Sequence, residues 1–113
     1  MLFMHNDIQQ LTGLIKAFVD ERDWDQFHNP KDLALALSIE AAELNEAFLW
    51  KSPDKVNPEK VSEELADVFI YALLMAAKCN LDVVEIVRDK LTRNAEKYPA
   101  AKAKGRSDKY NEL

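Results

Sequence analysis

The chain has 113 residues, of which 48% are hydrophobic and 31% charged, and its formal net charge is −5 at pH 7. This is the length of one domain, and the acidic balance excludes the global basic field that attracts nucleic acid. The single cysteine, Cys79, excludes an intrachain disulfide and indicates a reducing compartment. Ala, Leu, Glu and Lys dominate while only two Gly are present, so the composition predicts a helical protein.

The amino-terminal sequence MLFMHNDIQQ lacks the basic and long apolar segments of a secretory signal peptide. The longest apolar run, residues 68–77, is about half the length of a membrane span. We therefore expect a cytoplasmic protein that has no membrane partner.

Capping residues, prolines and apolar periodicity predict four helices in chain order. They cover approximately residues 7–23, 30–50, 58–79 and 82–98. Their expected N-caps are Asn6 or Asp7, Asn29, Asn57 and Asp82. Residues 100–113 form a basic tail, and nothing indicates a second domain. The prediction is a single all-α domain over residues 1–113, a unit that resembles a four-helix bundle.

Carboxylates at helical spacing stand in the second and third helices. Glu40 and Glu43 are three residues apart and therefore share a helix face. Glu64 and Asp67 have the same spacing on the next helix, where Tyr71 lies within about 60° of them. The spacing therefore predicts that two carboxylate pairs are directed into one interior.

No Lys or Arg stands between Lys31 and Lys51, nor between Lys60 and Lys78. Crowded carboxylates raise one another's pKa, and a divalent cation removes that conflict. All-oxygen ligation suits Mg²⁺, with Mn²⁺ as an alternative, and Mg²⁺ keeps coordination positions for water and substrate phosphates. The pattern therefore predicts metal-assisted phosphate chemistry.

The acids have two other interpretations. They could form a solvated helix face, although exposed faces usually mix charges of both signs. A di-iron carboxylate bundle would need Glu-x-x-His on two helices, and neither His5 nor His28 stands in such a motif. Glu46 and Glu63 flank the set and are left open as outer ligands or surface residues.

At these residues the sequence resembles the MazG-like all-α nucleoside triphosphate pyrophosphohydrolases, and the dCTP pyrophosphatase branch most closely. The family pattern of Glu-x-x-Glu followed by Glu-x-x-Asp reads here IEAAELNEAF and SEELADVFIYAL. The segments ERDWDQFHNPKDL, FLW and NAEKYP also match, as does a late KY-EL tail. The similarity covers residues 18–113, and these additional blocks make it specific.

The resemblance implies Mg²⁺-dependent cleavage of a dNTP between the α and β phosphates, which yields a dNMP and pyrophosphate and cleans the nucleotide pool. It implies catalytic and metal-ligand roles for Glu40, Glu43, Glu64 and Asp67. It implies substrate contacts for Trp24, Trp50, Tyr71, Lys90, Asn94 and Tyr98. A polar histidine of related dCTP enzymes aligns near Ile15, and this departure affects base preference rather than the reaction class.

Two other functions are compatible with the sequence. A pyrophosphatase of the same superfamily could act on dUTP or phosphoribosyl-ATP, and a non-catalytic helical interaction protein would need no Mg²⁺. Base preference, the number of metals and the identity of the general base, Glu43 or Glu40, are left open.

The predicted helices also bear on assembly. The third helix is apolar all round and the first carries an apolar stripe, and four helices cannot cover both surfaces. We therefore expect a homo-oligomer. A tetramer arranged as a dimer of dimers is the favoured form.

Overall fold

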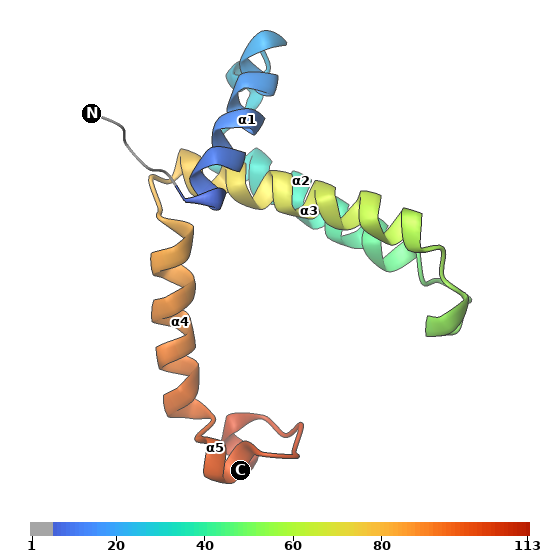
Figure 1. Cartoon of the computed structure of the whole chain (residues 1–113), viewed down its shortest axis with the longest axis vertical. Coiled ribbons are helices and arrows are strands. Elements are labelled where there is room, and N and C mark those ends of the chain that lie inside the picture. Colours follow the sequence, from blue (N-terminus) through green and yellow to red (C-terminus); the bar gives the residue numbers. More distant parts are fainter. Residues whose placement is uncertain (1–5) are drawn as a thin grey trace. The chain divides into compact units, whose positions relative to one another are not determined.

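The computed structural model describes residues 6–113, and the helices occupy most of this range (Figure 1). The five helices are α1 (Asp7–Glu21), α2 (Pro30–Glu46), α3 (Pro58–Lys78), α4 (Val83–Lys97) and α5 (Ala100–Ala103). Three short 3₁₀ turns lie at Asp25–Phe27, Pro53–Lys55 and Tyr110–Glu112, and the described residues contain no strand. The all-α prediction is confirmed. The expected absence of a signal peptide rests partly on residues 1–5, which lie outside the described residues.

The four long helices begin at the caps that the sequence predicts. A side-chain oxygen of each cap accepts a hydrogen bond from a backbone N–H of the first turn, at 2.8 to 3.0 Å. These caps are Asn6, Asn29, Asn57 and Asp82. Each satisfies a donor that has no partner within its helix, which fixes where the helix starts.

Helix α2 ends earlier than predicted. The sequence favoured a helix as far as Trp50, but regular α2 stops at Glu46. Over the next residues each N–H bonds to the carbonyl three positions back, from Phe48 to Asn45 and from Leu49 to Glu46, both at 3.0 Å. This tighter winding brings the chain to Trp50, whose φ of 62° is left-handed and ends the turn.

Helices α1, α2 and α3 belong to a first compact unit that extends to Leu81, in which α2 and α3 lie side by side (Figure 1). Helix α1 packs against α3 as well. The buried apolar side chains are few and come from all three helices and the turn after α2. They are Ile15, Val19, Leu33, Ala47, Leu73, Leu74 and Ala76.

Much apolar surface of this unit is open within one chain. Leu35 and Ile39 on α2 are 57% and 59% exposed, and Phe69 on α3 is 56% exposed. The all-round apolar pattern of α3 therefore does not correspond to full burial within the single chain.

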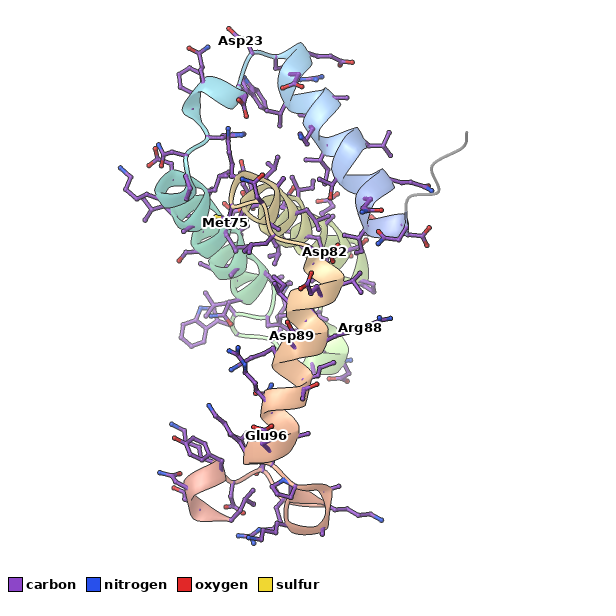
Figure 2. The ribbon with its side chains drawn as sticks, turned by 90° about the vertical axis from the view of Figure 1, so that its left-hand side faces the viewer. Asp23, Met75, Asp82, Arg88, Asp89 and Glu96 are labelled. Atoms are coloured by element: carbon purple, nitrogen blue, oxygen red, sulfur yellow. The ribbon has the colours of Figure 1, made fainter. Side chains whose placement is uncertain are left out.

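The second unit begins at Asp82 and contains α4, α5 and the tail. Arg88, Asp89 and Glu96 project from α4, which is a charged helix along much of its length (Figure 2). At its end the ring of Tyr110 meets that of Tyr98 edge-on, with centroids 6.2 Å apart. The ammonium of Lys97 lies 5.1 Å from the Tyr110 ring, so the tail folds back onto the end of its own helix.

Candidate active site

Three carboxylates from α2 and α3 meet in the first unit and are called the acid cluster here: Glu40, Glu43 and Glu64. One oxygen from each lies within 4.8 Å of those of the other two. The spacing of three residues directs Glu40 and Glu43 to the same side of α2, and the pairing of α2 with α3 brings Glu64 to them. Glu64 is only 6% exposed, so the cluster reaches into the packed part of the unit.

The surroundings of Glu40 oppose its negative charge. Burial raises the pKa of Glu40, and its hydrogen bond with Glu43 and the charges of Glu43, Asp67 and Glu64 raise it further. The Oε2 atoms of Glu40 and Glu64 are buried and have no hydrogen-bond partner among the described residues. Unpaired buried oxygens are costly, so the cluster is arranged for a positive ligand.

Lys60 supplies a counter-charge to the acid cluster. Its Nζ lies 2.7 Å from Oε1 of Glu64, one helical turn away on α3. The hydrogen bond from Lys60 lowers the pKa of Glu64, and the same contact raises the pKa of Lys60. A count of cations between the acids cannot detect this pair, because Lys60 stands just outside them at the i, i+4 spacing.

Asp67 and Tyr71, the next residues along this face of α3, lie beside the acid cluster. Asp67 is not part of the group within 4.8 Å, but its charge raises the pKa of Glu40. Burial raises the pKa of Tyr71, and the charges of Glu40 and Asp67 raise it further. The face predicted for the third helix therefore forms as expected, with Asp67 at the margin of the cluster.

The donor set fits a hard divalent cation. Carboxylate oxygens are the ligands that Mg²⁺ and Mn²⁺ prefer, and two of them are buried without a hydrogen-bond partner in the part of the chain that the structure describes. A cation at this place would lower the cost of holding Glu40 and its neighbours ionised together. The residues that could hold it are the acid cluster, with Asp67 as a fourth.

A cavity of about 400 Å³ adjoins the acid cluster through Asp67 and Tyr71. It is called the apolar cavity here, because aliphatic and aromatic side chains of α1 and α3 form most of its wall. Its lining residues are Leu14, Ile15, Phe18, Val19, Trp24, His28, Asp67, Ile70, Tyr71 and Leu74. Its size and its few polar groups are typical of a small-molecule site.

Trp24 is held at this cavity by the way α1 ends. Asp23, labelled at the turn in Figure 2, has a φ of 54°, and the N–H of Trp24 bonds to the carbonyl of Val19 at 3.1 Å. This is the Schellman arrangement that closes many helices. The Trp24 ring meets Phe18 edge-on at 5.9 Å. The structure thus places Trp24, a substrate contact implied by the resemblance, in the cavity wall.

A second cavity, of about 360 Å³, also has residues of the loop after α1 in its wall. Its wall is more polar and includes Lys16, Asp20, Asp25 and Lys78. Nζ of Lys78 lies 2.9 Å from Oδ1 of Asp25, which ties the loop to α3. This hydrogen bond lowers the pKa of Asp25. His28 lines both cavities, a position that sequence reasoning did not assign to it.

The other implied substrate contacts lie elsewhere. Trp50 is 93% exposed and lines neither of these cavities. Lys90, Asn94 and Tyr98 follow one another at four-residue spacing from α4 to its C-cap in the second unit. Their contact with a substrate stays a prediction.

None of the helices in the described part of the chain combines the length and the hydropathy that a membrane span requires. The fold and the site together define a class: an all-α protein whose paired helices join an acidic cluster to an apolar cavity.

Comparisons with known proteins agree with this class. The MazG-like family model matches residues 35–113. Human dCTP pyrophosphatase 1 is 40% identical over 114 aligned positions, which cover 94% of this chain and 67% of the human protein. The mouse dCTP pyrophosphatase 1 is 38% identical with the same coverage. A crystal structure of a pyrophosphatase from Archaeoglobus fulgidus is 36% identical, with a TM-score of 0.78 over 88% of this chain and 98% of that one. The chain belongs to the MazG-like family.

Proposed function

We propose that the chain is a Mg²⁺-dependent nucleoside triphosphate pyrophosphohydrolase that converts dCTP, or a related or modified dNTP, to the dNMP and pyrophosphate. The observation that carries this proposal is the junction of the acid cluster with the apolar cavity at Asp67 and Tyr71. A nucleotide has the same division, with a phosphate end that needs cations and a base that leaves water readily. The names of the mouse and human relatives favour dCTP.

In this function Glu40, Glu43, Glu64 and Asp67 hold the cation. When bound, Mg²⁺ (or Mn²⁺) supplies positive charge against the triphosphate and makes a nearby water molecule more acidic. Glu43 or Glu40 accepts the proton of the water that attacks the α phosphorus. The Oε2 of Glu40 is buried and has no hydrogen-bond partner within residues 6–113, so it suits either ligation or proton transfer.

The apolar cavity receives the base in the same proposal. The face of Trp24 stacks on the ring, and stacking of this kind tolerates several bases. Ile15, an apolar side chain, lines the cavity where related dCTP enzymes are expected to have a polar histidine. The base preference of this chain therefore depends on the few polar groups that remain in the wall.

We place the remaining substrate contacts on α4 and on the turn after α2. Lys90 provides a point charge for the phosphates, while Asn94 and Tyr98 provide hydrogen-bond donors. Trp50 holds a left-handed backbone that costs a bulky residue about 1 kcal/mol or more, and its ring is free to reach a substrate or a second chain.

A homo-oligomer, with a tetramer as the favoured form, is part of the proposal. The support is the apolar surface that one chain leaves open on α2 and α3, which includes Leu35, Ile39 and Phe69. Large exposed apolar patches mark interaction sites. Light scattering at micromolar concentration should give a mass of at least two chains.

The test is pyrophosphate release from each canonical dNTP, several modified dNTPs and phosphoribosyl-ATP, with and without Mg²⁺. We expect turnover that requires the cation and is fastest with dCTP or a close analogue. Fastest turnover of dUTP or phosphoribosyl-ATP would keep the reaction and change the substrate. No pyrophosphate from any substrate would favour a non-catalytic interaction protein.

A further inference from the structure

One face of α3 runs from the apolar cavity through the acid cluster and continues one turn beyond it. Toward the amino end of the helix its residues are Leu74, Tyr71, Asp67, Glu64 and Lys60, at alternating spacings of three and four. This spacing keeps them on one side of an α-helix. The first three line the cavity, and Glu64 belongs to the acid cluster. Lys60 therefore lies on the far side of the acids from the cavity.

The order of groups along this face sets the direction of a nucleotide bound as proposed. With its base in the apolar cavity and its α phosphate at the acid cluster, the β and γ phosphates continue away from the base. An α-helix rises about 1.5 Å per residue, which puts Lys60 about 6 Å beyond Glu64 along the axis. The pyrophosphate end of the substrate is therefore expected on the side of Lys60.

The ammonium of Lys60 has donors and space for a ligand at this place. Its Nζ lies 2.7 Å from Oε1 of Glu64, which holds it at the edge of the acid cluster, and its side chain is 52% exposed. A lysine ammonium has three N–H donors, so donors remain for a phosphate after one meets Glu64. A strongly hydrated point charge of this kind suits phosphate oxygens.

We infer that Lys60 binds the β and γ phosphates and stabilises the pyrophosphate as it leaves. This inference rests on the proposed function, because it concerns the leaving group of the same reaction. It gives the first unit a phosphate ligand of its own, whereas Lys90 belongs to the second unit.

The need for a cation at the pyrophosphate follows from the bonds that change. The oxygen of water bonds to the α phosphorus, and one proton of that water passes to Glu43 or Glu40. The bond from the α phosphorus to the bridging oxygen breaks, and its electron pair leaves with the pyrophosphate. Negative charge therefore grows on the leaving group, where the ammonium of Lys60 opposes it.

The two products separate a pyrophosphate contact from a general effect on the acid cluster. Pyrophosphate and the dNMP of the preferred substrate are titrated separately into each protein by calorimetry at saturating Mg²⁺. Lys60→Met keeps most of the side-chain length and removes the charge, while Lys60→Arg keeps the charge. Lys55→Met is the matched control, because Lys55 is an exposed lysine in the turn before α3.

We expect Lys60→Met to weaken the binding of pyrophosphate by roughly tenfold or more, as the loss of a hydrogen bond to a charged group predicts. The affinity for the dNMP should not change, because its phosphate lies at the acids rather than beyond them. The kcat for the preferred dNTP should fall by at least about tenfold. Lys60→Arg should keep most of the pyrophosphate affinity, and Lys55→Met should resemble the wild type.

Two results would overturn the inference while the proposed function stands. The first is an unchanged affinity of Lys60→Met for pyrophosphate. The second is an equal loss of affinity for both products, which would mean that Lys60 organises the acid cluster as a whole. Lys60→Gln, which also removes the charge, provides the same comparison if Lys60→Met does not fold. A wild-type protein that releases no pyrophosphate from any dNTP would instead refute the proposed function itself.

Discussion

The acid cluster and the apolar cavity share α3 but are built on opposite physical principles. In the cluster, burial and the neighbouring carboxylates raise the pKa of Glu40, and two buried oxygens have no hydrogen-bond partner among the described residues, so the cluster is suited to a cation. The cavity is lined mainly by side chains with no charge to balance. Substitutions in the two regions should therefore have distinguishable effects. Those in the acid cluster should change the dependence on the cation, and those in the apolar cavity should change the affinity for the substrate.

The largest expected effect comes from the cluster. Glu43→Gln or Glu64→Gln should lower kcat by at least about a hundredfold, because even residues that only support a metal ligand contribute 10- to 100-fold. Pyrophosphate release under saturating Mg²⁺ measures this. The control is Glu63→Gln, an exposed acid on the same helix, which should be nearly as active as the wild type. Equal loss in all three variants would mean that net charge, not the cluster, is responsible.

A smaller effect on affinity should come from the cavity. Trp24→Ala should raise KM by roughly tenfold, since stacking on an aromatic ring contributes about 1–3 kcal/mol per base. The Mg²⁺ concentration that gives half-maximal activity should not change. Phe27→Ala removes a neighbouring aromatic ring that lies outside the cavity and serves as the control. A shift in the Mg²⁺ requirement of Trp24→Ala would break the proposed separation of the two regions.

Lys60 provides a way to sharpen the description of the cluster. Lys60→Met removes the ammonium that occupies one oxygen of Glu64, so Mn²⁺ should bind the nucleotide-free protein severalfold more tightly. Calorimetric titration with Mn²⁺ measures the change. Lys55→Met, which removes a charge from the turn before α3, should leave the affinity near that of the wild type. Weaker binding in Lys60→Met would indicate that the lysine organises the cluster rather than competing for it.

The smallest effect concerns the ion pair that fixes the loop beside the cavity. Because Lys78 lowers the folded-state pKa of Asp25, the pair stabilises the protein above the unfolded pKa of about 3.9. That stability is lost as the pH falls through the lower folded-state pKa. Asp25→Asn should therefore melt slightly earlier than the wild type at pH 7, and the two curves should converge in acid. A difference that grows in acid would contradict this sign.

The sequence predicted the helices well where local chemistry decides them. Asn29 and Asn57, each followed by Pro, define helix starts without any help from distant residues. The predicted end of α2 was wrong. No glycine marks the left-handed turn that follows the helix, and Trp50 is an unusual residue in that conformation. The all-α class and the MazG-like family that the motifs indicated are both confirmed.

The site divides in the same way between local and distant causes. The spacing of Glu40 and Glu43 is local, so their common face on α2 could be predicted, and the packing of α3 on α2 brings Glu64 to them. The metal and substrate roles stay predictions. The position of His28 in the walls of both cavities could not be foreseen, because it depends on how α1, the loop and α3 pack around one ring.

Among the described residues, three residues other than glycine hold a left-handed backbone. Asp23 and Asn80 lie just beyond α1 and α3, and Trp50 lies in the turn after α2. Asp and Asn tolerate the left-handed conformation, whereas the same backbone conformation is strained for the bulky Trp50. An engineer who wanted a more heat-resistant protein would therefore choose Trp50→Gly first. This substitution should raise the free energy of unfolding by about 1 kcal/mol. Stabilisation of this kind commonly reduces function where a strained residue serves it. The left-handed turn at Trp50 thus marks a point where thermal robustness and turnover should trade against each other.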